Sequence, residues 1–146
     1  MHSIIISVGN KMPPWCKLAC DDYIKRLQHF LKCALLEIPV SNPLDEGRKI
    51  LQKINNGDTV ISLEVLGQAW STPELSQKLS RWKMEGNNLV FIIGGPDGLS
   101  PLCIERATHH WSLSALTLPH ALARVIVCEQ LYRAGSILAN HPYHRE

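Results

Sequence analysis

The sequence lacks the features that mark membrane and secreted proteins. No apolar stretch approaches the roughly 20 residues that a membrane-spanning helix needs. No basic region precedes the short apolar run at residues 4–6, so we expect no secretory signal. The five cysteines form no Cys-x-x-Cys pair, and their odd number favours reduced packing thiols over a disulfide framework. These absences predict a cytoplasmic protein with no membrane partner.

Excess charge of one sign is also scarce. With 15 Lys and Arg against 13 Asp and Glu, the net charge is +2, which is too small to indicate a nucleic-acid-binding protein from composition alone. The sequence shows no internal repeat, linker or low-complexity tract. The 146 residues therefore fit one domain, 1–146, which is long enough to bury roughly two-thirds of its unfolded surface.

What the chain has instead is an alternation of apolar strands and amphipathic helices. Apolar runs predict strands, and apolar residues three or four positions apart predict helices. The expected strands cover residues 3–9, 34–40, 59–65, 89–93 and a stretch from 111 onward, and the expected helices cover residues 15–31, 50–54, 72–85, 100–109 and 119–140. This order indicates an α/β fold with a parallel open sheet and helices on both faces.

The loops that follow the third, fourth and fifth strands are the candidate site, because ligands of such sheets bind outside the carboxyl ends of the strands. These loops contain residues 63–67, 94–98 and 114–120. The second, Gly94-Gly95-Pro96-Asp97-Gly98, must turn sharply, and its glycines let a ligand approach the main chain. The third joins an apolar, hydroxyl-bearing strand to a helix that Pro119 opens. An alternative is that residues 94–98 form only a tight turn.

The usual nucleotide motifs are missing from these loops. A dinucleotide fingerprint needs Gly-x-Gly-x-x-Gly after the first strand, which ends here in the single Gly9. A P-loop needs Gly-Lys-Ser/Thr, and Gly98 is followed by Leu99. What remains is a small uncharged pocket with hydroxyls at Ser112, Ser114 and Thr117, which suits an adenosine-type ligand. The strand order alone also permits a flavodoxin-like nucleotide-binding module.

Four linked motifs and the start of the chain resemble one known family. These segments are Val8-Gly9-Asn10-Lys11-Met12, Gly94-Gly95-Pro96-Asp97-Gly98-Leu99-Ser100-Pro101, Trp111-Ser112-Leu113-Ser114-Ala115-Leu116-Thr117-Leu118-Pro119-His120, Glu129-Gln130-Leu131-Tyr132-Arg133-Ala134 and His141-Pro142-Tyr143-His144-Arg145-Glu146. They occur in the order found in the ribosomal large-subunit pseudouridine N3-methyltransferases, the RlmH family of the SPOUT superfamily. The resemblance spans nearly the whole chain.

The resemblance implies a C-terminal trefoil knot, an S-adenosyl-L-methionine cofactor and a homodimer. It also implies methylation of N3 of a pseudouridine in large-subunit (23S) ribosomal RNA. By the family's pattern, the residues that contact the cofactor are Leu63, Gly95, Ser114, Ala115, Leu116, Thr117, Leu118 and Pro119. These residues belong to the three loops that the strand order selects independently. The alternative for this fold is a ribosome-binding factor that does not catalyse.

Methyl transfer to an imide nitrogen needs placement and a proton acceptor, but no metal or covalent nucleophile. The best proton acceptor has a pKa near ambient pH, which points to histidine. We expect His144 to act as this base or to orient the uracil-like ring, Tyr143 to stack on that ring, and Arg133 to hold a phosphate or carbonyl.

Each of these residues also has a plainer interpretation. The C-terminal residues of most chains are loosely ordered and solvated. Arg133 follows Glu129 by four residues, which is the spacing of an ordinary helix-surface ion pair. The spacing of His141 and His144 suggests metal ligands, but no further ligand is spaced with them, so we expect no metal. We expect His109, His110 and His120 to lie at helix ends.

The last helix is apolar or small almost all round, which indicates burial on more than one side and favours a twofold homodimer.

Two departures from the family bear on docking. Gly135 stands where many members have an aromatic residue, which weakens the helix by about 1 kcal/mol and removes a packing surface. The connection at residues 39–47 is short and poorly basic. We therefore expect RNA contact from other basic residues, namely Lys25, Arg26, Arg81, Lys83 and Arg145, and an assembled ribosomal particle as the substrate.

Overall fold

The protein folds around one parallel β-sheet with helices on both faces. The structure is a computed structural model, and it describes residues 1–9 and 12–145. The strands are β1 (His2–Val8), β2 (Lys32–Ile38), β3 (Thr59–Ala69), β4 (Leu89–Ile93) and β5 (His109–Ser112), and they pair in the order β2-β1-β4-β3-β5. All four pairings are parallel. The predicted α/β class with a parallel open sheet is confirmed. Asn10, Lys11 and Glu146 of the family motifs lie outside the described residues.

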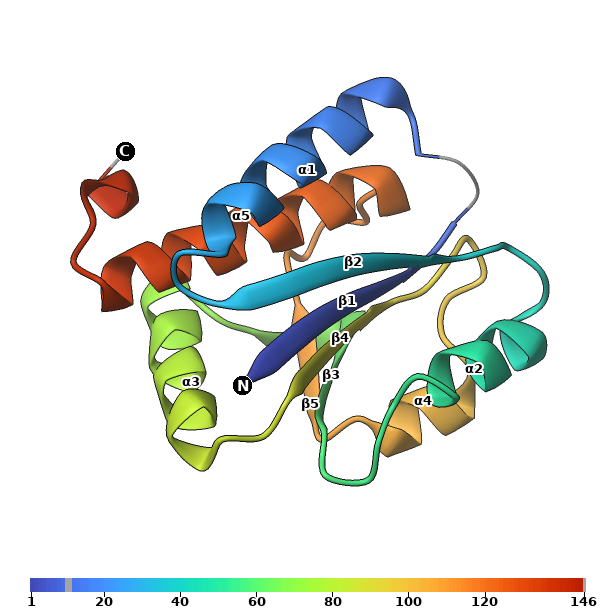
Figure 1. Ribbon diagram of the computed structural model, residues 1–146. Helices are drawn as coiled ribbons and strands as arrows, with labels where there is room; N and C mark the ends of the chain where they lie inside the picture. The colour runs from blue at the N-terminus through green and yellow to red at the C-terminus, as the bar shows by residue number, and fades with distance from the viewer. Residues whose placement is uncertain (10–11, 146) are drawn as a thin grey trace.

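Helices cover both faces of this sheet, as predicted. The helices are α1 (Pro14–Leu27), α2 (Pro43–Leu51), α3 (Thr72–Glu85), α4 (Pro101–Arg106) and α5 (His120–Leu138), followed by a short 3-10 helix, η1 (Pro142–Arg145). Figure 1 shows α1, α3 and α5 on one face, and α2 and α4 on the other. Within residues 1–9 and 12–145, no helix is both long and apolar enough to cross a membrane.

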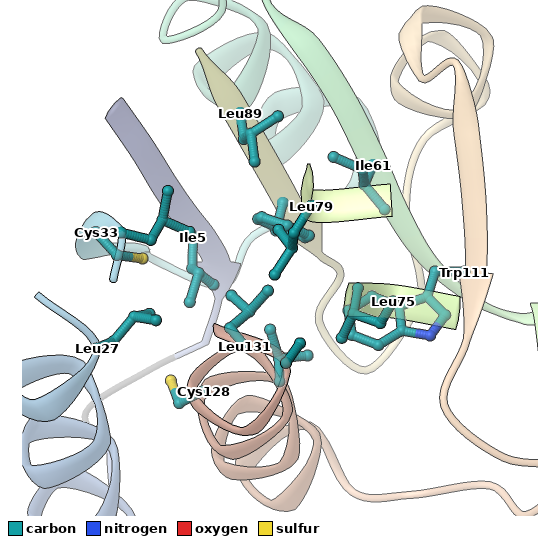
Figure 2. Close-up of a cluster of buried hydrophobic side chains, with 14 of the residues drawn as sticks. Ile5, Leu27, Cys33, Ile61, Leu75, Leu79, Leu89, Trp111, Cys128 and Leu131 are labelled. Carbon is teal, nitrogen blue, oxygen red and sulfur yellow. The ribbon is translucent and has the colours of Figure 1, made fainter. Parts of the chain in front are cut away.

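The larger core lies between the sheet and α1, α3 and α5. Figure 2 shows Leu27 of α1, Leu75 and Leu79 of α3, and Leu131 of α5 converging on sheet residues such as Ile5. A smaller cluster on the other face packs α2 and α4 against the sheet. All five cysteines are buried free thiols, which confirms the prediction made for them.

The last helix is buried by its own chain. Its inner residues Val127, Cys128 and Leu131 are fully buried in the larger cluster, to which α1 and α3 also contribute. The helix keeps only two clearly exposed large apolar side chains, Leu122 and Leu138, within the described part of the chain. Burial on several sides is therefore confirmed, but packing within one subunit accounts for it. The burial of α5 therefore does not support the predicted homodimer. The trefoil knot stays a prediction.

Capping side chains explain where several helices begin. Ser71 accepts from the backbone N–H of Glu74, and Glu74 reaches back to cap Ser71, which forms a reciprocal capping box. Asn42 accepts from the N–H of Asp45 and starts α2 at Pro43. The prediction placed this helix at residues 50–54 because it interpreted the Asn42-Pro43 pair as a turn. The structure corrects it to Pro43–Leu51, so half of the supposed 39–47 loop is helix.

Several other boundaries also differ from the predictions, and among them α1 ends at Leu27 rather than residue 31. β2 ends at Ile38 rather than residue 40, and β3 continues past residue 65 to Ala69 through an irregularity in its pairing with β5. α4 ends at Arg106 because Thr108 donates its N–H to the carbonyl of Val60 and the chain rejoins the sheet. His109 and His110 therefore lie in β5, not at a helix end. β5 ends at Ser112, so residues 113–119 form a loop rather than a strand.

The predicted consequence of Gly135 is only partly right. A methyl group at Gly135 would lie 2.9 Å from Cβ of Phe30, so the Phe30 side chain already fills this space. The Phe30 ring also packs on Tyr132, with 5.6 Å between the ring centroids. Phe30, in the segment after α1, thus supplies the aromatic contact that an aromatic residue at position 135 would make.

Candidate functional site

A pocket of about 610 Å³ opens at the carboxyl ends of β3, β4 and β5. Its walls come from the three segments that the sequence selects, together with the start of α5. The lining residues are Leu63, Glu64, Val65, Leu66, Ile93, Gly94, Gly95, Pro96, Gly98, Leu99, Ile104, Trp111, Leu113, Ser114, Leu116, Thr117, Leu118, Pro119, His120 and Ala123. The volume lies within the range of about 300–1,000 Å³ that small-molecule sites occupy.

Seven of the eight predicted cofactor residues line this pocket. They are Leu63, Gly95, Ser114, Leu116, Thr117, Leu118 and Pro119. Ala115 does not line it. Ser112, whose hydroxyl we expected in the pocket, does not line it either, and that hydroxyl donates to the carbonyl of Ser114 at 3.0 Å. The Ser114 hydroxyl in turn accepts from the N–H of Leu116 at 3.0 Å, so the loop is held by its own hydrogen bonds.

The glycine loop is both a tight turn and a wall of the pocket. A side chain at Gly94 would lie 2.7 Å from the carbonyl carbon of Gly98, and Gly98 has a φ of +77°. A side chain at Gly95 would lie 3.0 Å from Cγ1 of Val8. The N–H of Gly98 donates to the carbonyl of Gly95 at 3.0 Å and closes the turn. The packing of the protein itself therefore requires these glycines, which do not by themselves indicate a ligand.

One corner of the pocket is polar. Glu64 lines it, and the fully buried Ser62 donates its hydroxyl to Oε2 of Glu64. His110 Nδ1 lies 2.5 Å from the same Oε2 and 2.9 Å from Ser62 Oγ. A carboxylate only accepts hydrogen bonds, so Nδ1 carries the hydrogen of this contact. We did not predict this group. The signal available in the sequence was an acid at the carboxyl end of a buried strand.

The rim of the pocket is apolar and exposed. Leu66 is 97% exposed and Leu116 is 71% exposed, and both line the opening. Exposed apolar side chains beside an open pocket are typical of a surface that a ligand or partner covers.

The predicted catalytic residues lie elsewhere, in a network at the end of α5. Arg133 donates from Nε to Oε1 of Glu129 at 2.7 Å, so the plain ion-pair interpretation of this spacing is confirmed. The hydroxyl of Tyr143 donates to the same oxygen at 3.2 Å and lies 3.4 Å from that of Tyr23. Burial raises the pKa of the Tyr143 phenol above its usual value, and Tyr23 and the negative charge of Glu129 raise it further.

The tail is anchored by Tyr143, although the residues around it are exposed or partly exposed. The Tyr143 ring is buried, lies 4.5 Å from that of Tyr132 between centroids, and has the guanidinium of Arg26 over it at 5.0 Å. His144 is partly exposed, and its Nδ1 contacts the carbonyl of His141. The other predicted RNA-contacting residues, Lys25, Arg81, Lys83 and Arg145, are exposed, and Lys83 also donates to the carbonyl of Phe30 at 3.1 Å.

Within one chain, the pocket and the tail lie at opposite ends of α5. His120 and Ala123 line the pocket at the start of this helix, and η1 follows its end. The helix has 19 residues, which corresponds to about 28 Å at 1.5 Å per residue. Figure 1 shows the short red helix η1 beyond the end of α5 that lies away from the β5–α5 loop. The structure therefore does not bring the two sets of predicted site residues together in a single subunit.

Known proteins with similar sequences are methyltransferases. The family described as "Predicted SPOUT methyltransferase" matches residues 1–144. A relative from Hahella chejuensis (strain KCTC 2396), named "Ribosomal RNA large subunit methyltransferase H", is 49% identical over 156 residues, with 100% of both chains covered. A protein of the same name from Marinomonas sp. (strain MWYL1) is 47% identical over 155 residues, covering 99% of this chain and 100% of that one.

Two solved structures share the fold at low identity. A probable methyltransferase from Bordetella pertussis Tohama I has a TM-score of 0.58 at 14% identity, covering 91% of this chain and 95% of that one. A probable methylase family protein from Haemophilus influenzae Rd KW20 has a TM-score of 0.56 at 12% identity, covering 97% of this chain and 69% of that one. These two similarities concern the arrangement of the helices and strands.

Proposed function

The chain belongs to the ribosomal RNA large subunit methyltransferase H family of SPOUT methyltransferases, and from this membership we propose that it transfers a methyl group from S-adenosylmethionine to N3 of a pseudouridine in large-subunit ribosomal RNA. One observation carries the proposal. The Ser114–Pro119 segment of the family motif and two other loops enclose one pocket of the right size at the sheet edge. Action on ribosomal RNA fits a cytoplasmic location.

The lining of the pocket fits the proposed cofactor. Its walls are mostly apolar side chains and main chain, which suit an adenosine. The residues that line it include one carboxylate and no Lys or Arg, which suits a cationic sulfonium better than a polyphosphate. When bound, S-adenosylmethionine supplies an electrophilic methyl group. Leu63, Gly95 and the Ser114–Pro119 segment would hold it.

We further propose that the active form is a homodimer in which the tail of one subunit faces the pocket of the other. The separation of about 28 Å along α5 supports this arrangement, because one chain does not bring its own tail to its own pocket. Trp15 and Leu18 of α1 are 54% and 73% exposed, and Leu122 of α5 is also exposed. The Cys16 thiol donates to the carbonyl of Ala121, so α1 and α5 meet here and offer an apolar face for a second copy.

In this dimer His144 is the proposed proton acceptor for the target nitrogen, because its imidazole is partly exposed whereas the Tyr143 ring is buried. Arg133 is proposed to fix a carbonyl or phosphate of the substrate, with Glu129 orienting its guanidinium. The Tyr143 ring already packs against Tyr132, so we propose that it anchors the tail rather than stacking on the target base. Lys25 and Arg145 are candidates for backbone contacts with RNA.

A methyl-incorporation assay tests the proposed reaction. The protein and labelled S-adenosylmethionine are incubated with free large-subunit RNA, isolated large subunits and joined ribosomes, and the modified nucleotide is identified by mass spectrometry. We expect N3-methylpseudouridine, formed fastest on assembled particles because a net charge of +2 gives little affinity for naked RNA. Equal rates on all substrates would overturn the preference for particles. Ribosome binding without incorporation would indicate a non-catalytic binding factor instead.

A further inference from the structure

Glu64 is the single carboxylate among the residues that line the pocket. Its side chain is 22% exposed, so the surrounding protein replaces most of its hydration. Oε2 accepts from Ser62, and His110 Nδ1 lies 2.5 Å from it. Oε1 has no hydrogen-bond partner among residues 1–9 and 12–145. The protein thus fixes Oε2, and Oε1 is available to accept a hydrogen bond from a bound ligand.

Glu64 lines the pocket, so a ligand bound there can supply the hydrogen-bond donor that Oε1 lacks within the protein. Ser62 and His110 hold the carboxylate through Oε2 and so fix the direction in which Oε1 can accept a hydrogen bond. In nucleotide-binding sheets of the doubly wound type, an acid at the carboxyl end of a strand accepts a hydrogen bond from a ribose hydroxyl. Glu64 lies near the end of the regular part of β3, directly after Leu63.

We infer that Oε1 of Glu64 accepts a hydrogen bond from a ribose hydroxyl of the adenosyl cofactor, and that Ser62 and His110 are positioning residues for this contact. The inference rests on the proposed function, which places S-adenosylmethionine in this pocket. The sugar is the fitting partner because it is neutral and pairs with a partly buried carboxylate without bringing a second charge out of water.

The test measures the coupling between the carboxylate and the hydroxyl. S-adenosylhomocysteine and its 2′-deoxy and 3′-deoxy analogues are titrated calorimetrically into the wild type and Glu64→Ala. For the wild type, loss of the bonded hydroxyl should weaken binding about 10- to 100-fold, as for a hydrogen bond to a charged group. For Glu64→Ala, the same loss should change affinity less than about twofold. Glu64→Gln, which keeps the side-chain shape, should fall between the two.

Glu85→Gln is the control. Glu85 is an exposed acid at the end of α3 that does not line the pocket, so this variant should discriminate between the analogues as the wild type does. For His110 the two variants Ala and Asn are compared. His110→Ala should lose most of the discrimination, and His110→Asn should restore it because an amide N–H replaces the Nδ1 donor. Thermal unfolding without ligand identifies any variant that is unfolded, in which case Glu64→Gln is used.

The possible failures are distinguishable. If the wild type binds none of the S-adenosyl compounds, the proposed function fails and this inference falls with it. If the wild type binds them and Glu64→Ala keeps full discrimination against the deoxy analogues, only the ribose contact is overturned. 5′-Methylthioadenosine, which lacks the amino acid end, gives a second measurement. A Glu64→Ala effect on S-adenosylhomocysteine that is absent for 5′-methylthioadenosine would assign the carboxylate to the ligand's ammonium group and also overturn the ribose contact.

Discussion

The pocket and the C-terminal tail differ in how the chain builds them. The pocket is made from main chain and apolar side chains where three strands end, and Glu64 is its one acid. The tail is a compact network of charged and aromatic groups in which Glu129 accepts from both Arg133 and Tyr143. The first region depends mainly on main-chain geometry, including the tight turn at residues 94–98. The second needs specific side chains from α1, α5 and η1.

This difference supports the proposed division of work between the two regions. A concave, largely apolar pocket binds a small molecule but offers few groups for proton transfer. A cluster of Arg, Tyr and His recognises an anionic, aromatic substrate such as RNA. Because α5 holds the two regions about 28 Å apart, a second subunit is the means by which they would act together.

The sharpest test of this division is His144→Ala. We expect the turnover number to fall by about 10²- to 10⁴-fold, the usual contribution of a general base, with donor affinity unchanged. The measurements are methyl incorporation on ribosomal particles and calorimetric titration with S-adenosylmethionine. His29→Ala removes an exposed imidazole distant from the tail motif in sequence and serves as control. A parallel loss of donor affinity in His144→Ala would show that the two regions are not separable.

Mixed dimers test whether the regions meet between subunits. Gly95→Leu should disrupt the wall of the pocket, since even a Cβ there would lie 3.0 Å from Val8 and displace the glycine loop. Neither Gly95→Leu nor His144→Ala should turn over alone. Co-expressed in equal amounts, they should recover about a quarter of the wild-type rate, because half of the dimers are mixed and each mixed dimer has one intact site. No recovery in dimers isolated with two different tags would place each active site within a single chain.

Tyr143→Phe should loosen the tail without affecting the pocket. It removes a hydrogen bond worth about 0.5–1.5 kcal/mol, and thermal unfolding should report a loss of that size. The raised pKa of Tyr143 also predicts a pH dependence. Its contribution to stability is complete below the unfolded pKa of about 10 and is lost as the pH rises through the higher folded value. The wild type should lose more stability than Tyr143→Phe above pH of about 10, and parallel curves would contradict this.

The smallest effect is expected at the rim. Leu66 is 97% exposed, so Leu66→Ser should change the free energy of unfolding by less than about 0.5 kcal/mol. The fully buried Leu131 is the matched comparison, and Leu131→Ala should cost about 2–5 kcal/mol. Urea unfolding of both variants at low protein concentration checks the pair. A large cost for Leu66→Ser would mean that a partner already covers the rim under those conditions.

Local sequence signals predicted much of the fold. The all-apolar run Leu89–Ile93 is a strand with the predicted bounds, because a strand buried on both faces carries a continuous apolar sequence. The Ser71 cap and the αL residue Gly86 delimit α3 as expected. Asn42 with Pro43 was misinterpreted, since the same pair opens either a turn or a helix and only the bond to Asp45 distinguishes them.

The candidate site was predicted in part. The strand order and the family motif both selected the three loops of the pocket, because the carboxyl ends of parallel strands meet at one edge. Ser62, Glu64 and His110 were not recognised as a group, since 46 residues separate the acid from the histidine and no local spacing relates them. The Phe30 ring over Gly135 was missed for the same reason.

The sequence by itself determined the alternation of elements, the parallel sheet and the family, because these depend on apolar periodicity, caps and contiguous motifs. Only the tertiary structure decided which oxygen of Glu64 is held by the protein, which aromatic side chain fills the space beside Gly135, and that α5 keeps the tail away from the pocket of its own chain. Such facts depend on pairs of residues far apart in the chain, and distances between such pairs are set by packing rather than by spacing.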